Sequence, residues 1–519
     1  MPFSIPRLTA LCLSLTLALS VFPALADPMD QPQPFARPGP THPGAIEASW
    51  TSVRLPSGDH TALLGLNYFV ALDEDWGVGP AVYGAAKGNY GGIFTMGFAV
   101  QRRWRIGAHA HISAGLYAGA GGGLSSNSLS FGGGLMLRPE LALHNEFDNG
   151  WYSGVTWSRV RFPSGNVRSS SLGFVIGKAQ DFGSFSPQDS GRPGAGSARS
   201  GFGFDEVVLF GGAYKPSGSS RNRSGAPMTG KLGTAGADLR QYIADGSWWA
   251  AEAAGAAQGG SDGYMQLLLK AGQDWPLGNT GLRAGAELGI GLGGGGNIDT
   301  GNGWIASVGP SVRWQTPWGA SLHLDAGLTR SFSGHFSAPF LRLGLGLPLD
   351  QLPSPFAPES QNTGTVLTQQ LMMSAQHLQH VRFKDGSSAP VTELALLMTR
   401  ELSSNVYGVA HAGSAAIGHA GAYSFGLFGL GLQTRAYAFA GQQLRFGAEA
   451  LVGAGGGGGV AVGGGAIGQA EAWAQLEADR LRLRLGVGDW RTLRGADQQS
   501  SPMINLSLGY AFGTLARGQ

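Results

Sequence analysis

Three segments of the chain carry an arginine that is followed, four residues later, by a second ionisable side chain. The pairs are Arg105 with His109, Arg283 with Glu287, and Arg445 with Glu449. Apolar residues alternate with small or polar ones in each segment, which places both members of a pair on one face of a β-strand. As lumen-lining residues, they would form a ring of alternating charge that tunes the passage of ions or solutes. Alternatively, they form a cross-strand polar ladder that satisfies buried groups and fixes register. The ladder is the simpler interpretation, and the two are compatible.

Serine, histidine and further charged residues stand near the first pair. Alternating positions hold His109, His111 and Ser113, and a later strand holds Arg138, Glu140 and His144. Serine hydrolysis needs a histidine that contacts the serine and is oriented by a carboxylate, and the spacing selects no such set. The run Gly259 to Gly263 spells a nucleophile elbow, but it joins two alternating strands, where a hairpin turn is expected. We therefore expect no catalytic residue, no cofactor and no metal site.

The three charged segments mark one architecture that is repeated along the chain. Each repeat contains about eight alternating strands, near the length of 9–11 residues that a tilted membrane strand requires. A glycine run ends each charged segment, at Gly121 to Gly123, Gly293 to Gly296 and Gly455 to Gly459. Such runs are either flexible loop tips or strand segments where another backbone approaches closely. Because all three lie at the same point of their repeat, we expect them to act at one level of the structure.

The start of the chain is typical of a secretory signal. Arg7 precedes an apolar run from Leu8 to Phe22, and Ala24-Leu25-Ala26 forms a small-residue cleavage site, so residues 1–26 are predicted to be a signal peptide. The single cysteine, Cys12, lies in this segment, and the exported chain therefore has no disulfide to hold it. The net charge is only +2, with no run of either sign, which argues against nucleic acid as a partner.

The last strand alternates from Ile504 to Phe512, with apolar and aromatic residues on one face and small or polar residues on the other. This pattern resembles the closing strand of Gram-negative outer-membrane β-barrel proteins, although members of that class usually end on the aromatic residue itself. The resemblance covers the exported chain as architecture and identifies no particular family. It implies a transmembrane antiparallel β-barrel in the cell outer membrane, in contact with outer-membrane lipid and lipopolysaccharide. It also implies insertion by the barrel assembly machinery.

The other interpretation of the alternation is a soluble β-sandwich or a secreted glycine-rich repeat protein. Three observations favour the membrane, and one of them is that the exported sequence has no cysteine and no obvious core helix. The apolar face recurs in nearly every strand, and aromatic residues such as Trp151 and Tyr510 lie near strand ends, where membrane barrels carry aromatic girdles.

Composition divides the chain into repeats and linkers. Residues 27–44 form a flexible leader, residues 45–177, 201–349 and 365–513 form barrel repeats 1 to 3, residues 178–200 and 350–364 form linkers, and residues 514–519 form a C-terminal tail. The fold class is all-β, and three repeats of about eight strands close either as one barrel of about 24 strands or as three small barrels. Inward positions are often Gly, Ser or Ala, which would leave voids in a small barrel, so we expect the single large barrel. The long linkers argue for three barrels.

A wide barrel in the outer membrane predicts a porin-like channel or an export pore. The alternative is a structural or adhesive surface barrel without an open pore. A barrel enzyme that acts on lipid or polysaccharide is the least favoured function.

Overall fold

The computed structural model describes residues 35–123, 128–196, 200–317, 319–349, 362–495 and 498–517. These residues are almost entirely antiparallel β-structure, and their only helical element is the 3-10 turn η1, Pro187–Asp189. Contacts gather Ala36–Gln519 into one compact unit. No helix in the described part of the chain is long and apolar enough to cross a membrane. The predicted signal peptide, residues 1–26, lies outside the described residues.

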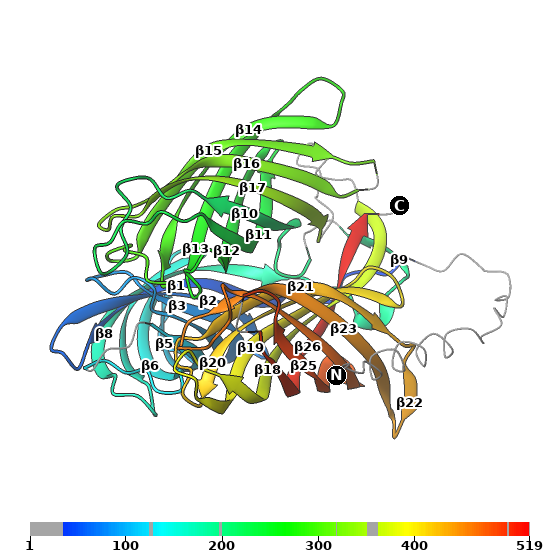
Figure 1. Cartoon of the computed structure of the whole chain (residues 1–519). Coiled ribbons are helices and arrows are strands. Elements are labelled where there is room, and N and C mark those ends of the chain that lie inside the picture. The colour runs from blue at the N-terminus through cyan, green and yellow to red at the C-terminus, as the bar shows by residue number, and fades with distance from the viewer. Residues whose placement is uncertain are drawn as a thin grey trace, which may run out of the picture. The chain divides into compact units, whose positions relative to one another are not determined.

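Each repeat closes on itself as an eight-stranded barrel, coloured blue to cyan, green, and yellow to red in Figure 1. The strands of barrel 1 are β1 His42–Arg54, β2 His60–Ala71, β3 Trp76–Ala85, β4 Phe94–Arg105, β5 Ala110–Gly122, β6 Leu135–Glu146, β7 Trp151–Arg161 and β8 Arg168–Phe182. The strands of barrel 2 are β10 Glu206–Tyr214, β11 Leu232–Ala244, β12 Ser247–Gln258, β13 Met265–Pro276, β14 Leu282–Gly294, β15 Trp304–Gln315, β16 Ser321–Ser331 and β17 Ser337–Pro348. The strands of barrel 3 are β18 Asn362–Arg382, β19 Ser388–Glu401, β20 Val406–Ile417, β21 Ser424–Gln433, β23 Gln442–Gly456, β24 Ala466–Ala478, β25 Leu481–Thr492 and β26 Ser500–Arg517.

Strand pairing corrects the expected single large barrel. The first strand of each repeat pairs with the last strand of the same repeat: β1 with β8, β10 with β17, and β18 with β26. Because β18 also pairs with β19, the third ring is closed as well. All-β antiparallel barrel structure is therefore confirmed, but as three small barrels and not as one barrel of about 24 strands.

The single large barrel was predicted because inward glycines were expected to leave voids in a small barrel. In the structure they leave no such voids. A Cβ atom at Gly272 would overlap the ring of Trp248, and a Cβ atom at Gly447 would overlap the ring of Trp473. In barrel 1, Gly65 makes room for Tyr83 in the same way. The interior of an eight-stranded barrel is just wide enough for side chains to fill, and here a glycine on one strand accommodates a large aromatic ring on its neighbour.

Glycine-rich loops hold the three barrels together. In barrel 1, the end that holds the start of β1 and the end of β8 is called the terminal end, and the opposite end is called the glycine end; the same names are used for the corresponding ends of the other barrels. At the glycine end, Gly91 of barrel 1 donates a backbone hydrogen bond to Gly301 of barrel 2 at 3.0 Å, and Gly421 of barrel 3 donates one to Gly132 of barrel 1 at 3.1 Å. Asp262 of barrel 2 pairs with Lys384 of barrel 3 at 2.7 Å. The contacts therefore run from barrel 1 to 2, from 2 to 3, and from 3 back to 1.

The glycine runs are required for this close approach. A Cβ atom at Gly294 would overlap the backbone of Gly92, and a Cβ atom at Gly456 would overlap that of Gly263. Of the two expectations for these runs, the close approach of another backbone is therefore confirmed, and the approaching backbone belongs to the next barrel.

The structure describes the predicted linker 178–200 except for residues 197–199. It contains the end of β8, the turn η1 and the short strand β9, Pro193–Gly196, which pairs with the start of β18. The predicted tail likewise belongs to β26 as far as Arg517, and Phe512 is buried against Phe182 and Phe202, with ring centroids 5.2 and 5.5 Å away. Of the second linker, residues 350–361 lie outside the description.

Candidate functional site

The interior of barrel 2 holds a network of charged side chains. The Lys270 ammonium lies 2.9 Å from a Glu287 carboxylate oxygen, 3.2 Å from Asp238 and 3.3 Å from Glu252. Arg342 pairs with Glu252 at 2.5 Å, and Arg240 pairs with Asp238 at 3.1 Å. All six side chains are between 0% and 2% exposed, so water has no room beside them.

These residues alternate along their strands, which places them all inside the barrel. Aromatic rings close the space around them: the Arg240 guanidinium stacks 4.0 Å from the centroid of the Trp248 ring, and Arg342 lies 4.6 Å from that of Phe340. Buried charges are stable only when they are paired and hydrogen-bonded. The network therefore fills the interior with mutually compensating groups.

The other two barrels are filled on the same principle. In barrel 3, Arg484 pairs with Glu449 at 3.2 Å, and both side chains are at most 2% exposed. Tyr407 donates a hydrogen bond to Glu449 at 2.5 Å, and the Trp473 indole donates one to Tyr407 at 2.8 Å. In barrel 1, Arg138 is 0% exposed and pairs with Glu140 at 2.5 Å.

The six residues predicted to line a lumen fall into three positions. Glu287 and Glu449 point into barrels 2 and 3 and are buried. Arg283 and Arg445 lie near the terminal end, half-buried, where they pair with Asp245 at 3.0 Å and with Glu477 at 2.9 Å. Arg105 and His109 are exposed, Arg105 at the last residue of β4 and His109 in the turn that follows it. They line no interior, and the six residues form no common ring because they belong to three separately closed barrels.

The pair Arg105 and His109 is not equivalent in strand register to the other two pairs. Gly122, Gly294 and Gly456 each pair with the first residue of the preceding strand, which makes them equivalent positions in the three barrels. Counted back from these glycines, the equivalents of Glu287 and Glu449 in barrel 1 are not His109 but Gly115. A Cβ atom at Gly115 would lie 3.3 Å from the Glu140 side chain. Barrel 1 thus supplies the same carboxylate from the neighbouring strand.

Lys270, Arg342 and Arg484 lie at the centre of these networks but were not predicted. The sequence does contain a signal for them, since each is a cation at an inward position of an alternating strand. Lys270 and Arg342 are the only cations of their strands, and Arg484 lies two residues from a second inward arginine, Arg482. Alternation alone places such a residue inside, and only the neighbouring strand shows which carboxylate compensates it.

Barrel 1 brings together serine and histidine side chains near its terminal end. The Ser113 hydroxyl lies 2.9 Å from Nε2 of His144, whose ring stacks on that of His111 with centroids 4.4 Å apart. The nearby carboxylate, Glu146, contacts Nδ1 of His111 at 3.2 Å and not His144. Ser113 and His144 are only 3% and 2% exposed. The carboxylate therefore does not orient the histidine that contacts the serine, and both of these side chains are buried.

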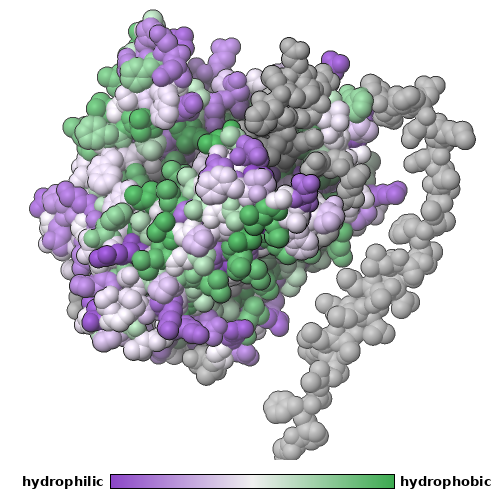
Figure 2. All heavy atoms as spheres, turned by 90° about the horizontal axis from the view of Figure 1, so that it is seen from above, coloured by the Kyte–Doolittle hydropathy of each residue, from purple (hydrophilic) through white to green (hydrophobic). Residues whose placement is uncertain are grey.

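The outer faces of the barrels carry the most distinctive surface. Most of the exposed large apolar side chains lie from the fourth strand of each barrel onward, and Figure 2 shows such residues gathered in green patches over one face. Their exposed fractions range from 44% to 74%; examples are Leu141, Leu172 and Phe174 in barrel 1, Leu288, Leu328 and Leu343 in barrel 2, and Leu430, Leu485 and Leu508 in barrel 3. We call this surface the apolar belt. Soluble monomers rarely expose apolar surface on this scale.

No protein-family model matches the chain, and no curated protein is detectably similar in sequence. Solved structures align along most of it. OccK2 (OpdF) of Pseudomonas aeruginosa aligns over 92% of this chain and 98% of its own, at 10% identity and a TM-score of 0.21. A bacterial polysaccharide outer membrane secretin aligns over 91% and 98%, at 8% identity and a TM-score of 0.22. The FrpB iron transporter of Neisseria meningitidis aligns over 91% and 82%, at 8% identity and a TM-score of 0.25. TM-scores this low do not establish a common topology, so the architecture rests on the strand pairing of this chain.

Proposed function

We propose that the chain is an outer-membrane protein of a Gram-negative bacterium that serves as a structural barrel assembly without an open pore. Two features support a membrane location. The apolar belt offers side chains that lipid can contact, and the closed barrels leave no backbone polar groups unpaired in lipid. Outer-membrane lipid and lipopolysaccharide would contact this belt, and the barrel assembly machinery would insert the chain. The exposed Ile504, Leu506 and Leu508 of β26 fit the closing-strand pattern, although the buried Phe512 departs from it.

The observation that carries the choice against an open pore is the buried charge network of barrel 2. A water-filled channel exposes its lining side chains to solvent, whereas the Lys270 ammonium and its carboxylate partners are at most 2% exposed. The small bore of an eight-stranded barrel favours the same conclusion. A porin-like role would need a rearrangement that breaks these ion pairs.

A structural role is favoured over an adhesive one because the loops at the glycine end are engaged with one another. The longest polar loop, Ser217 to Ser224, turns toward barrel 1, where Arg223 donates a hydrogen bond to the carbonyl of Asn89 at 2.9 Å. Loops that hold neighbouring barrels together are not free to bind a distant partner.

The test is conductance of the refolded protein in a planar bilayer, with insertion checked by heat-dependent gel mobility and a wide porin as the positive control. We expect folded, inserted protein and no stable conductance steps. Large and regular steps would overturn the closed-barrel proposal while leaving the membrane location intact. A protein that cannot be inserted at all would overturn both.

Conduction is kept as a second candidate because the interior of barrel 2 carries more acidic than basic side chains. Inward carboxylates include Glu206, Asp238, Glu252, Asp274, Glu287 and Asp325, against the cations Arg240, Lys270, Arg313 and Arg342. Such a lining would select cations if the barrel opened. In that case, Glu287→Gln would shift the reversal potential toward lower cation selectivity.

We propose no enzymatic activity. The arrangement of Ser113, His144 and Glu146 supports this, because the carboxylate contacts the wrong histidine and the serine is buried.

A further inference from the structure

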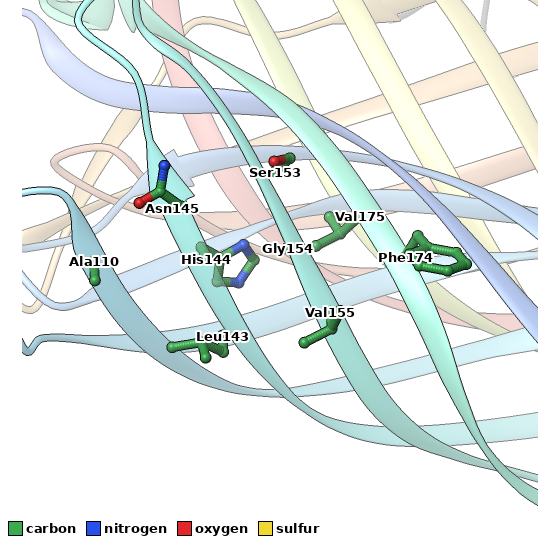
Figure 3. Close-up of a pocket in the computed structure, with 9 residues that line it drawn as sticks. All are labelled: Ala110, Leu143, His144, Asn145, Ser153, Gly154, Val155, Phe174 and Val175. Atoms are coloured by element: carbon green, nitrogen blue, oxygen red, sulfur yellow. The ribbon is translucent and has the colours of Figure 1, made fainter.

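The outer face of barrel 1 contains a hollow of about 550 Å³ across strands β5 to β8. Leu143, Val155 and Phe174 flank it, and each of these side chains is about half exposed or more, at 48%, 51% and 68%. Asn145 and Ser153 lie at its end nearer the terminal end (Figure 3). Binding pockets for small ligands typically measure about 300–1,000 Å³, so the hollow has the capacity of a binding site.

The hollow exists because one outward position on β7 is small. Trp151, Ser153, Val155 and Trp157 alternate along the outer face of this strand, and only Ser153 lacks a large side chain. Its cross-strand neighbours are Asn145 on β6 and Ile176 on β8. Ser153 therefore leaves a gap that Asn145 borders on one side and Val155 borders along the strand.

A cationic and aromatic pair stands at the terminal rim of the hollow. Trp151 and Lys178 face each other across β7 and β8, one outward position beyond Ser153 and Ile176. The Lys178 ammonium lies 5.7 Å from the centroid of the Trp151 ring, and the lysine is exposed. Outward neighbours on one strand are roughly 7 Å apart, so a ligand seated beside Ser153 would reach the ammonium.

Apolar walls, two hydrogen-bonding side chains and a terminal cation match one kind of molecule. We propose that the hollow binds an anionic phospholipid, with an acyl chain between Leu143, Val155 and Phe174 and the phosphate at Lys178. Asn145 and Ser153 would hydrogen-bond the glycerol ester groups. This inference rests on the proposed function, which places the hollow in the apolar belt at the level of the lipid.

The orientation of the chain selects phospholipid over lipopolysaccharide. Asn145 and Ser153, which line the hollow, lie close to the short turn of residues 147–150 between β6 and β7, at the terminal end. Short turns of outer-membrane barrels lie on the periplasmic side, which assigns the terminal end to that side, where the leaflet is made of phospholipid. Basic residues near a membrane surface are attracted to anionic headgroups, and an aromatic ring beside them fits the interface.

Native mass spectrometry of the refolded protein in detergent tests the site, with phosphatidylglycerol and phosphatidylcholine titrated separately. We expect one tightly retained phosphatidylglycerol. Ser153→Trp fills the hollow and should weaken retention of both lipids by about tenfold. Lys178→Gln should weaken phosphatidylglycerol by about fivefold and leave phosphatidylcholine unchanged. Leu343→Trp is the matched control, because it adds an indole to the belt of barrel 2 away from any hollow, and it should change nothing.

Equal retention by the wild type and Ser153→Trp, or an equal loss with Leu343→Trp, would overturn the site and indicate general annular lipid. Insertion into vesicles is measured on the same samples by heat-dependent gel mobility. If the protein inserts but retains no lipid, the lipid site is refuted and the proposed function is unaffected. If the protein fails to insert, the proposed function is refuted.

Discussion

Replacing Lys270 by methionine removes the cation at the centre of barrel 2. Methionine matches the length of the lysine stem, so the main change is the lost charge. Of the three carboxylates that contact Lys270, Glu252 keeps Arg342 at 2.5 Å and Asp238 keeps Arg240 at 3.1 Å. Glu287 keeps only Arg240, at 3.9 Å. The substitution thus leaves one carboxylate without a close partner in a closed interior.

An uncompensated charge of this kind costs about 3–5 kcal/mol of stability. The loss should be confined to barrel 2, because Lys270 contacts no residue of another barrel among its ion pairs. Adding Glu287→Gln removes the orphaned charge, and the double variant should recover about half of the loss or more. Lys384→Met is the matched control: Lys384 is 57% exposed in its pair with Asp262, and such surface pairs contribute about 1 kcal/mol or less.

Hydrogen exchange followed by mass spectrometry resolves the effect barrel by barrel. Peptides from β13 and β14 should exchange on the order of 10² to 10³ times faster in Lys270→Met, with β1 to β8 unchanged. If Lys270→Met costs no more than Lys384→Met, water must already solvate the interior charges. That result would refute the closed-barrel reasoning and favour an open lumen.

Two further substitutions test the packing of glycine. Gly272→Ala should destabilise barrel 2 by about 1–3 kcal/mol in chemical unfolding, because the new methyl group meets the buried Trp248 ring; Gly211→Ala in the same barrel has open space around it and should be neutral, so an equal loss in both would contradict the packing argument. Gly92→Ala should loosen barrel 1 from barrel 2, because it meets the backbone of Gly295, and limited proteolysis of the loop at residues 86–93 should become faster. Gly58→Ala is its control, since Gly58 has a similar positive φ of 91° with no neighbour within 4 Å; equal cleavage in both variants would assign the effect to backbone strain alone.

Local sequence pattern was sufficient for much of the fold. Alternation with period two depends only on neighbouring residues and the pleat of a strand, so β26 could be predicted as a strand with Ile504, Leu506 and Leu508 on its outward face. The repeat of charged segments and glycine runs likewise indicated one architecture used three times. Glu287 and Glu449 were predicted on an inward face for the same reason.

Pattern failed where a turn interrupts the alternation. Arg105 and His109 keep the period, although Ile106 to His109 form the four-residue turn between β4 and β5. A turn of even length preserves parity along the chain, so periodicity cannot detect it. The hydrogen-bond register with β4 shows that Gly115 takes the equivalent position and that Glu140 fills its space.

The sequence by itself determined that the chain is built of two-faced strands, in three repeats, with a small residue at regular inward positions. Only the tertiary structure decided how many barrels they form. Closure depends on which strand β1 pairs with, and that partner, β8, is more than a hundred residues away from it in the chain. From the sequence of one strand, an inward glycine predicts an empty space inside the barrel. In the structure, the Trp248 ring on the neighbouring strand fills the space beside Gly272. The same local pattern is compatible with a wide pore and a filled barrel, and the aromatic side chains supplied across strands select the filled one.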